Sequence, residues 1–477
     1  MPPRAMLQMY VDGMIKPTHS AQTLDLINPA TEELIAVVAA GGVMDVDEAV
    51  MAARRALPGW RGSEPAERGN VLDAIADAYE SRSQAIASLV TMENGSPWWW
   101  TEQENVHFAA QIYRQAATVA RQIQPTAQIQ REGKRSLACR EGVGVVAAIV
   151  PWNSPQVLLA LKLATALAAG CTVVAKPSPE TSLDAFVLAE AFDAAGVPPG
   201  VVNIVTGAGE TGEALIHHEG VDKVSFTGST AVGRSIASIC GNKLRPVSAE
   251  LGGKSAALIL EDADLGTFAS LINRECIPYS GQVCFSCTRI LAPRRRFTDV
   301  LETVVETLAS TPFGDPSDKT TVIGPLVSAR QRDRVEQLIR SGLDDGARPV
   351  LGGNRPSDYP VGYYVAPTVF VDVQPQMRIF QEEIFGPVLT VLPYDDEEDG
   401  VRLHNDSHYG LSGMVFGRDV THATEVAMRL ETGQVLVNGY RGPPTPHAAF
   451  KDSGLGQAGV DRLADYQRVK AVTQPSG

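Results

Sequence analysis

The sequence is poor in the features that mark secreted and membrane-spanning proteins. Its 477 residues include six cysteines, at positions 139, 171, 240, 276, 284 and 287, without the dense spacing of a disulfide framework. The first residues, Met-Pro-Pro-Arg-Ala-Met, do not open an apolar signal segment. The longest apolar stretch, 157–175, contains Lys162 and is better explained by a buried helix and strand than by a membrane span. We expect a cytoplasmic protein with no membrane partner.

Positive charge is also scarce. The 41 Lys and Arg residues are outnumbered by 55 Asp and Glu, which gives a formal net charge of −14. This balance argues against a nucleic-acid partner, and the run 294–296 of three arginines is too short to reverse it. The Cys284-x-x-Cys287 pair has no second Cys-x-x-Cys and no nearby histidine, so we expect no metal site.

What the sequence does contain is a long globular chain with alternating strands and helices. Hydrophobic residues make up 44% and charged residues 20%, and the length predicts two or three domains. Helices are expected over 45–57, ended by Pro58-Gly59, and over 65–93. From residue 143 the apolar runs 143–150, 172–176, 201–205 and 224–227 alternate with helical patterns over 156–169, 182–195 and 210–218. Buried strands separated by helices are typical of a doubly wound parallel sheet.

Two further regions complete the predicted architecture. A second α/β set after residue 251 has helices near 299–309 and 329–342 and strands near 368–373, 388–393 and 434–437. The polar, alternating segment 123–142 predicts a projecting hairpin of the kind that pairs subunits, and the polar tail could add an edge strand. The three tryptophans 98–100 have two equal interpretations, helix packing or a pocket mouth.

Two glycine-shaped turns carry the candidate chemistry. Cys284 follows Gly281 in a short segment walled by small and apolar residues, and Glu250 lies in the turn Glu250-Leu-Gly-Gly-Lys254. A thiol nucleophile and a carboxylate base together suit covalent acyl-enzyme catalysis. Half-buried structural cysteines are the alternative.

Other turns suggest a nucleotide and an oxyanion. Gly207-Ala-Gly209-Glu-Thr-Gly212 and Phe226-Thr-Gly-Ser-Thr230 each follow a strand and open a helix, where phosphates bind. Spacing alone does not decide which of the two loops holds them. Asn153 follows the strand 143–150, at the edge where open α/β sheets place ligands, and its amide could donate to an oxyanion. A turn-forming role beside proline is the alternative.

Six motifs, in order, resemble the signature series of the NAD(P)-dependent aldehyde dehydrogenase superfamily. They are Pro151-Trp-Asn153, Lys176-Pro-Ser178, Phe226-Thr-Gly-Ser-Thr230, Glu250-Leu-Gly-Gly-Lys254, Gly281-Gln-Val-Cys284 and Glu382-Glu383-Ile-Phe385-Gly-Pro387. The resemblance runs from residue 28 to residue 456. It implies an α/β aldehyde dehydrogenase fold with a Rossmann-like cofactor domain (1–122 and 143–250), a catalytic domain (251–446) and an oligomerisation arm with the C-terminal tail (123–142 and 447–477).

The resemblance also implies roles. Cys284 would attack the aldehyde, Asn153 and the backbone N–H of Cys284 would hold the oxyanion of the thiohemiacetal, and Glu250 would activate water to hydrolyse the thioester. Lys176 would bind the adenosine ribose, Gly228 and Ser229 the pyrophosphate, Glu383 the nicotinamide ribose, and Phe385 would position the ring. Val232 would pack on the adenine side, which Gly209 could also touch. The remaining expected cofactor contacts are Ile149, Val150, Trp152, Ser178, Phe226, Leu251 and Gly252.

Some positions depart from the family pattern. Pro179 stands where NAD-preferring members often carry Glu, with Glu180 displaced by one, so NAD and NADP both stay open as cofactors. His447 replaces an aromatic of the substrate tunnel, and we interpret it as a tunnel or loop residue. Cys287 is interpreted as structural; a reversible disulfide or sulfenamide-type cap with Cys284 is the alternative.

The substrate is expected to be a small aldehyde. Leu158, Leu161, Phe285 and Tyr440 would line the tunnel and favour an apolar aliphatic or aromatic aldehyde, whereas Arg441 could meet the carboxylate of a semialdehyde. The alternatives are a semialdehyde dehydrogenase, including the CoA-acylating type, which usually lacks the Glu250 carboxylate, and a catalytically silent binding protein. A thiol–disulfide oxidoreductase would need a thioredoxin-sized context that the chain lacks. The arm and tail predict a homodimer or homotetramer.

Overall fold

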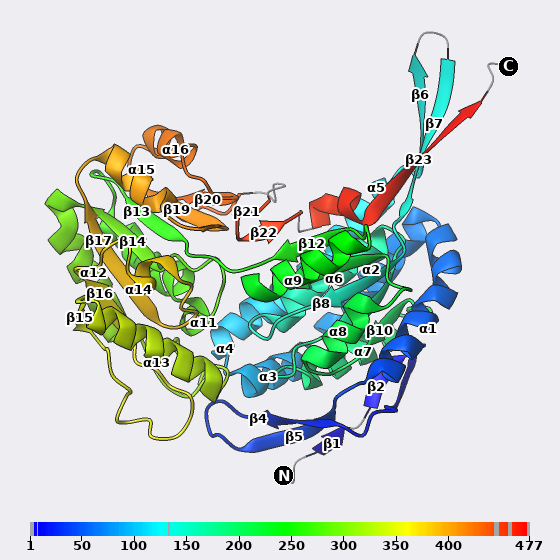
Figure 1. Cartoon of the computed structure of the whole chain (residues 1–477), viewed down its shortest axis with the longest axis horizontal. Coiled ribbons are helices and arrows are strands. Elements are labelled where there is room, and N and C mark those ends of the chain that lie inside the picture. The colour runs from blue at the N-terminus through cyan, green and yellow to red at the C-terminus, as the bar shows by residue number, and fades with distance from the viewer. Residues whose placement is uncertain (1–3, 7, 132–133, 443–447, 457–459, 475–477) are drawn as a thin grey trace.

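The computed structural model describes residues 4–6, 8–131, 134–442, 448–456 and 460–474, arranged as two α/β lobes and a projecting arm (Figure 1). One lobe is built on an eight-stranded sheet, the other on a seven-stranded sheet, and the arm on three strands. The predicted fold class is confirmed. The assignment of residues to separate domains stays a prediction.

The eight-stranded sheet forms the first lobe. Its order is β22 (Gly454–Leu455), β12 (Val247–Glu250), β11 (Lys223–Thr227), β8 (Val145–Ile149), β9 (Thr172–Lys176), β10 (Val202–Ile204), β2 (Gln8–Val11) and β3 (Met14–Pro17). The five strands from β12 to β10 are parallel, and the outer strands pair antiparallel. Strand β22, inside the predicted tail, therefore returns to this sheet rather than to the arm.

Helices cover both faces of this sheet because successive strand residues point to opposite sides. In β8, Val146 and Ala148 pack in one hydrophobic cluster with α2 (Pro65–Glu80), α5 (Ala109–Gln122), α6 (Pro155–Ala168) and α7 (Leu183–Ala194). Val145 and Ala147 pack in another, with α1 (Val43–Gly62), α8 (Gly209–His217) and α9 (Thr230–Asn242). The continuous apolar runs of the parallel strands follow from this double burial.

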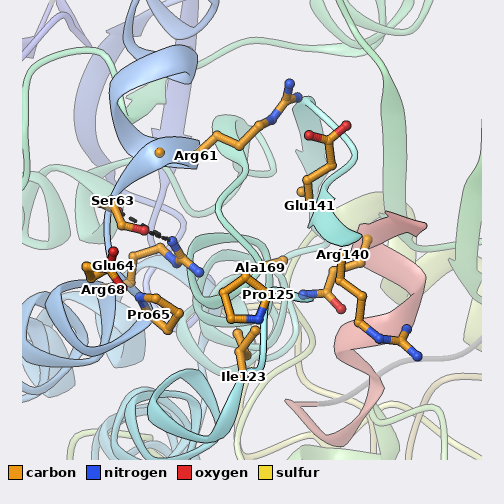
Figure 2. A pocket seen from close by; sticks show the side chains of 13 residues that line it. Arg61, Ser63, Glu64, Pro65, Arg68, Ile123, Pro125, Arg140, Glu141 and Ala169 are labelled. Atoms are coloured by element: carbon orange, nitrogen blue, oxygen red, sulfur yellow. Dashed lines mark hydrogen bonds between the residues drawn. The ribbon is translucent and has the colours of Figure 1, made fainter. Parts of the chain in front are cut away.

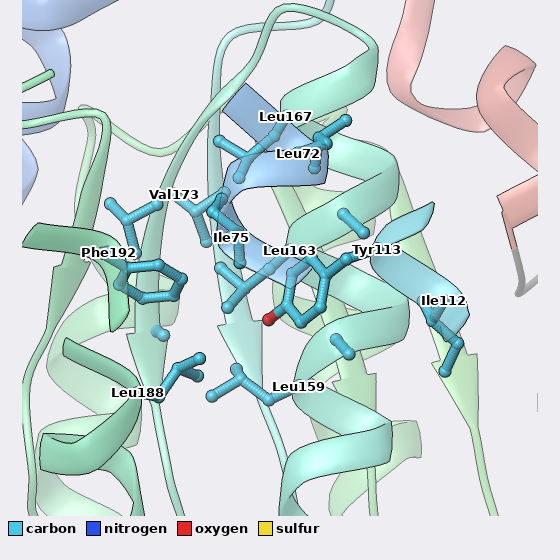
Figure 3. Close-up of a cluster of buried hydrophobic side chains, with 14 of the residues drawn as sticks. Leu72, Ile75, Ile112, Tyr113, Leu159, Leu163, Leu167, Val173, Leu188 and Phe192 are labelled. Atoms are coloured by element: carbon cyan, nitrogen blue, oxygen red, sulfur yellow. The ribbon is translucent and has the colours of Figure 1, made fainter. Parts of the chain in front are cut away.

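Helix α6 lies in the middle of the first of these clusters (Figure 3). Leu163 and Leu167 are fully buried between the sheet and the neighbouring helices, where Tyr113 and Phe192 also pack. A helix that is apolar on all sides belongs in a core, which confirms the interpretation of 157–175 as a buried helix and strand. Truncating such a leucine to alanine typically costs about 2–5 kcal/mol.

Two predicted helices have different bounds. Helix α1 continues through Pro58 to Gly62 instead of ending at Pro58. The predicted helix 65–93 is two helices, α2 and α3 (Ser83–Asn94), because the chain breaks at Ser81 and Arg82. Ser81 Oγ and Arg82 Nη1 both donate to the carbonyl of Ala78, at 2.7 and 2.9 Å, and satisfy the end of α2.

The second lobe has a mainly parallel sheet, of which only β15 is antiparallel among the described strands. Its order is β15 (Arg348–Leu351), β16 (Thr368–Val371), β17 (Val388–Tyr394), β14 (Arg289–Pro293), β13 (Ala256–Ile259), β19 (Ser412–Phe416) and β20 (Gln434–Val437). Helices α10 (Leu265–Leu271) and α12 (Phe297–Ser310) pack on one face. Helices α13 (Ala329–Asp344), α14 (Arg378–Gln381), α15 (Glu397–Asn405) and α16 (Val420–Ala427) pack on the other.

The arm projects from the first lobe, and the C-terminal strand runs along it (Figure 1). It consists of β6 (Thr126–Arg131), β7 (Lys134–Gly142) and β23 (Gln467–Gln474), in the order β23-β7-β6. The predicted hairpin and the predicted edge strand are thus confirmed and pair with each other. Two small sheets complete the described structure: β1 (Arg4–Met6), β5 (Leu34–Ala39) and β4 (Thr23–Ile27), and β18 (Tyr409–Gly410) with β21 (Phe450–Lys451).

Candidate active site

Cys284 lies in the loop between α11 (Pro278–Gly281) and β14. The loop begins with an unusual backbone, because Tyr279 and Ser280 have φ of 45° and 55° and Gly281 has φ of 76°. Non-glycine residues in the left-handed region are strained, and they cluster at functional sites when neighbouring structure holds them. The chain therefore bends sharply just before the cysteine.

Three hydrogen bonds to two other segments hold this bend. The Tyr279 hydroxyl donates to the carbonyl of Asn94, and Ser280 Oγ donates to the carbonyl of Gly324 at 2.8 Å. Gln282 Oε1 accepts from the backbone N–H of Val327 at 3.0 Å. All three side chains are fully buried, so these bonds are shielded from water.

Two glycines let other loops approach the cysteine loop closely. A Cβ at Gly253 would lie 2.3 Å from the carbonyl oxygen of Cys284, and one at Gly281 would lie 2.1 Å from the carbonyl oxygen of Gly386. Real Cβ atoms do not approach backbone oxygen so closely. The glycines of the two motifs therefore join the Glu250 turn, the Cys284 loop and the Glu383 segment into one site.

Asn153 lies just beyond β8 and is 5% exposed. Its side-chain Nδ2 donates to the carbonyl of Gln282 at 2.9 Å, two residues before Cys284. The loop that holds it is fixed in turn, because Asn94 Nδ2 donates to the carbonyl of Trp152 at 3.0 Å. A carboxamide has two N–H donors, so a second N–H remains for an oxyanion beside Cys284.

Glu250 is the last residue of β12 and pairs in register with Thr227 of β11. Thr227 Oγ1 accepts a hydrogen bond of 2.7 Å from the buried ammonium of Lys162. Burial lowers the pKa of Lys162 to about 8, and the negative charge of Glu250 opposes that shift. Glu250 also raises the pKa of Cys284, so its carboxylate acts electrostatically on both groups.

The Cys284 thiol is held in its protonated form. Burial raises its pKa to about 12, and the carboxylates of Glu383 and Glu250 add to the shift. A thiolate, not a thiol, is the nucleophile. The site must therefore remove a proton from Cys284 before it can attack, which gives a neighbouring base a role.

The predicted ribose and phosphate residues meet at the carboxyl edge of the parallel sheet. Lys176 ends β9, and its Nζ donates to the carbonyls of Gly207 at 2.6 Å and Pro177 at 2.9 Å. Ser229 caps the N-terminus of α9, and Val232 in its first turn is 49% exposed. An exposed apolar side chain, helix N–H groups and an ammonium along one edge fit a dinucleotide.

The two glycine loops follow β10 and β11, the strands that flank β8 and β9 in the sheet. Gly209 begins α8, close to Lys176, since a Cβ at Gly212 would touch the Lys176 side chain at 3.5 Å. The N–H of Gly228 donates to the carbonyl of Glu250 at 3.0 Å, and a Cβ at Gly228 would lie 2.5 Å from the Phe226 ring. Ile149 and Val150, at the end of β8, are buried beneath.

Glu383 contacts the Glu250 turn through its carboxylate. Its Oε1 accepts from the N–H of Gly253 at 2.9 Å, and a Cβ at Gly252 would lie 2.7 Å from its Oε2. Burial raises the pKa of Glu383 to about 7. Leu251 donates its N–H to the carbonyl of Ser453 at 2.9 Å, which fixes the turn from outside.

Glu180 has a position that the sequence could not specify. Its Oε2 accepts from Ser178 Oγ at 2.5 Å. Burial lowers the pKa of Lys176 to about 8, and the negative charge of Glu180 opposes that shift. A carboxylate is therefore present near the predicted ribose lysine, although Pro179 occupies the position expected for it.

Of the predicted substrate residues that the structure describes, three are half-buried and one, Tyr440, is exposed. Phe285 belongs to a cluster with Trp99, Trp100, Trp152, Tyr279 and Val283, which we call the Phe285 cluster. Trp152 lies edge-on to Phe385, with ring centroids 5.4 Å apart. Leu158 and Leu161 are half-buried on α6, and Tyr440 is 75% exposed at the surface. His447 lies outside the described residues.

The Phe285 cluster also answers the question of the three tryptophans. Trp100 is 2% exposed and packs against Tyr279 and Val283, on either side of the strained turn before Cys284. Trp99 and Trp100 therefore wall the cysteine loop, whereas Trp98 packs against the core of the first lobe.

The two cysteines of the pair have different environments. Cys284 is half-buried, whereas Cys287 is fully buried in the core of the second lobe with Cys276. All six cysteines of the chain are free thiols in this structure. The described residues contain no group of three or more side chains that could hold a metal ion.

Several residues that complete the site were not assigned a role from the sequence: Asn94, Gln282, Lys162 and Glu275. Gln282 lies within the motif Gly281-Gln-Val-Cys284, and Lys162 is a single charge in an apolar stretch, which is a usable signal. Asn94 and Glu275 gave no local signal, because Tyr279 and Arg441, the partners that tie them to the site, lie 185 and 166 residues away.

A separate pocket of about 170 Å³ lies at the base of the arm, away from these residues (Figure 2). Its walls include Arg61, Arg68, Arg140 and Glu141. Arg68 is buried and already donates to the carbonyls of Ala168 and Ser63. The candidate residues Cys284, Glu250 and Asn153 are not among the residues that line this pocket.

Comparisons with known proteins agree with this geometry. The family model described as the aldehyde dehydrogenase family matches residues 15–472. A geranial dehydrogenase of Castellaniella defragrans is 44% identical over 469 residues, which are 97% of this chain and 98% of the relative. An aldehyde dehydrogenase of Mycobacterium tuberculosis, solved with NAD+, superimposes with a TM-score of 0.96 at 39% identity, over 100% of this chain and 99% of the other. Aldehyde dehydrogenase C of Pseudomonas syringae, a cysteine-to-alanine variant solved with NAD+ and octanal, has a TM-score of 0.95 at 37% identity, over 98% and 97%.

The fold and site define a nicotinamide-dependent oxidoreductase with a cysteine nucleophile. The chain belongs to the aldehyde dehydrogenase family. The predicted family, fold class, enzyme class and NAD(P) cofactor are confirmed, and the silent binding protein and the thiol–disulfide oxidoreductase are no longer needed. No helix in the described part of the chain is long and apolar enough to cross a bilayer.

Proposed function

We propose that this enzyme oxidises an apolar aldehyde to the carboxylic acid with NAD+, using Cys284 as nucleophile, Asn153 as oxyanion donor and Glu250 as base. The observation that carries the proposal is the meeting of the three motifs. Gly253 brings the Glu250 turn against the Cys284 loop, and Asn153 Nδ2 donates to the carbonyl of Gln282 at 2.9 Å. Bound NAD+ supplies the hydride acceptor.

In the first step the chain forms the covalent bond. Cys284 loses its proton to Glu250, and its Sγ attacks the aldehyde carbon while the carbonyl π pair moves to oxygen. The free N–H of Asn153 and the backbone N–H of Cys284 stabilise that oxyanion. The raised pKa of Cys284 makes the proton transfer a necessary part of this step.

In the last step the chain releases the acid. After oxidation the acyl group is bound to Cys284 Sγ as a thioester. Glu250, after releasing the first proton to solvent, takes a proton from water, and the water oxygen bonds to the acyl carbon. The C–S bond then breaks to return the thiolate, which takes that proton back from Glu250. A carboxylate at position 250 therefore favours hydrolysis over transfer to CoA.

The cofactor contacts follow from the geometry of the sheet edge. Lys176 would hold the adenosine ribose, Ser229 and the first turn of α9 the pyrophosphate, and Glu383 the nicotinamide ribose. Glu180 lies near Lys176 and would repel a 2′-phosphate, which supports NAD over NADP. The two solved relatives described above contain NAD+.

The substrate class follows from the walls of the site. Leu158, Leu161 and the Phe285 cluster are apolar, and the only substrates named among the relatives described above, geranial and octanal, are neutral aldehydes. Each additional buried methylene should improve kcat/KM by about fourfold. Arg441, the candidate anchor for a semialdehyde, is already paired with Glu275.

The arm supports self-association into a homodimer or homotetramer. Strands β23 and β6 are the outer strands of its sheet, and Ile129, Val469 and Val472 are exposed apolar residues on it. Exposed strand edges and apolar side chains favour pairing with another chain. The six free thiols support a reducing, cytoplasmic location.

The test is a set of initial rates of reduced-nicotinamide formation with NAD and NADP. Acetaldehyde, hexanal, octanal, geranial and benzaldehyde are compared with succinate semialdehyde. We expect the apolar aldehydes to be best and NAD to exceed NADP by at least about tenfold. Glu180→Gln should reduce this cofactor preference, whereas Glu190→Gln on the exposed face of α7 should not. No turnover with any apolar aldehyde would refute the proposal, and equal rates with both cofactors would refute the NAD preference.

A further inference from the structure

Arg441 lies beside the wall of the aldehyde site. It follows β20, and its guanidinium carbon is 5.5 Å from the centroid of the Phe285 ring. Phe285 directly follows Cys284, and its ring centroid is 6.4 Å from that of Trp100. A cation at this place would act on any charged group that a substrate carries toward Cys284.

The positive charge of Arg441 is balanced by a buried carboxylate. Arg441 Nη2 donates to both oxygens of Glu275, at 2.9 and 2.8 Å, and Glu275 is 1% exposed. Arg274 Nε lies 3.6 Å from the same carboxylate. Glu275 also accepts, through its backbone carbonyl, the N–H of Cys287 at 2.9 Å, so it is fixed against the cysteine loop.

A fourth charged group completes this set. Glu104 is half-buried, and burial raises its pKa, while Arg441 and Arg274 oppose the rise and Glu275 adds to it. Two arginines and two glutamates therefore act on one another and sum to zero charge. Arg441 is 44% exposed, so it lies at the water-facing side of this set.

We propose that the Glu275–Arg441 ion pair is a specificity device that excludes aldehydes with a second, anionic group and leaves neutral aldehydes unaffected. The proposal rests on the apolar-aldehyde function proposed above. Glu275 neutralises Arg441 at 2.8 Å, so a substrate carboxylate that approaches the exposed side of the guanidinium gains little net attraction. Displacing Glu275 to gain more would leave a buried carboxylate without its partner, which is strongly unfavourable.

A neutral aldehyde meets no such obstacle. It contacts the Phe285 ring and the apolar residues without separating the ion pair. The pair also holds the guanidinium over the ring, where a cation is attracted to the aromatic face. Selection here arises from repulsion of the wrong substrate rather than from a new contact with the right one.

The test is Glu275→Gln, which keeps an oxygen acceptor for Arg441 but removes the negative charge. We expect kcat/KM for succinate semialdehyde to rise at least about tenfold and that for hexanal to change by less than about threefold. High salt should reduce the gain, because screening weakens the newly uncompensated charge. Glu431→Gln, which removes a surface partner of Lys451, is the matched control and should leave the ratio of the two substrates unchanged.

Two further variants separate this proposal from direct anchoring. If Arg441 itself binds substrate carboxylates, Arg441→Gln will abolish succinate-semialdehyde activity and spare hexanal; that outcome overturns the proposal. The double variant Glu275→Gln/Arg441→Gln removes both charges, should fold as judged by thermal unfolding, and should lose the gain of the single variant. An unchanged substrate ratio in Glu275→Gln also overturns it.

Failure of this inference differs from failure of the proposed function. If wild-type enzyme oxidises hexanal and octanal but Glu275→Gln does not alter the substrate ratio, only the role of the ion pair is wrong. If the wild type oxidises neither aldehyde, the proposed function itself is wrong.

Discussion

On the cofactor side of Cys284, the important side chains come from the ends of neighbouring parallel strands. Lys176 ends β9, Thr227 ends β11 and Glu250 ends β12. On the aldehyde side, the side chains come from three segments far apart in the chain: Trp100, the stretch that holds Glu275 and Phe285, and Arg441. The first arrangement repeats a rule of α/β sheets, whereas the second exists only after the lobes have packed.

The two sides also treat charge differently. Lys162 and Lys176 are buried cations with lowered pKa values and uncharged hydrogen-bond partners, so each responds to a nearby carboxylate. Arg441 and Glu275 instead form a closed pair. The comparison suggests that the cofactor side is built to receive charged groups and the aldehyde side to exclude them.

The largest expected effect comes from Cys284→Ala. Removing the nucleophile should lower kcat by at least about a thousandfold, because no thioester can form. Cofactor binding should persist, since the residues of the sheet edge are unchanged. Initial rates and the rise in thermal unfolding temperature with NAD measure the two sides separately. If the variant is folded by circular dichroism but has lost both activity and stabilisation by NAD, the cofactor side and the aldehyde side are not independent.

Lys176→Ala should affect the opposite side. Loss of a charged hydrogen-bond donor to the ribose should raise the KM for NAD by about 10- to 100-fold. The KM for hexanal should change little, because Phe285 and its neighbours are untouched. Steady-state kinetics with each substrate varied in turn checks this, and Lys243→Ala, a surface lysine on the far end of α9, serves as control. A rise in the aldehyde KM alone would show that the assignment is wrong.

A smaller, graded effect is expected from pH in the free enzyme. The pKa of Cys284 is raised to about 12, so the thiolate fraction should increase about tenfold per pH unit below that value. Iodoacetamide labelling of Cys284, followed by mass spectrometry, should therefore accelerate steadily from pH 7 to 9. Cys284→Ser supplies the background. A labelling rate that is already constant by pH 7 would mean that the free thiol is a thiolate.

Much of the cofactor side could be predicted from the sequence, because its regular alternation of strands and helices leaves local signals in the chain. The strand 172–176 was predicted with the bounds that β9 has, and Lys176, Glu250 and Asn153 fall at strand ends where ligands bind. Strand–helix alternation and glycine turns are local signals. The structure adds Glu180, whose carboxylate turns back toward Ser178.

The aldehyde side could not be predicted in the same way. Strands β13, β14 and β19 were not predicted, and β14 begins with Arg289, which resembles a surface residue in sequence. Its guanidinium is buried and donates to the carbonyls of Lys254, Leu403 and His404, partners that lie 35 to 115 residues away. The sequence interpretation left Arg441 open as a carboxylate anchor, because nothing near it in sequence indicated Glu275.

The most direct test of the central claim is to trap the acyl-enzyme. Glu250→Gln should form the thioester more slowly than the wild type, because Cys284 must then lose its proton to water, and should hydrolyse it more slowly still. Mixing the variant with NAD and octanal should therefore give about one equivalent of reduced nicotinamide before turnover nearly stops. Mass spectrometry of the quenched protein should then locate an octanoyl group on the peptide that contains Cys284. A burst with the acyl group on another residue, or turnover at the wild-type rate without a burst, would contradict the account.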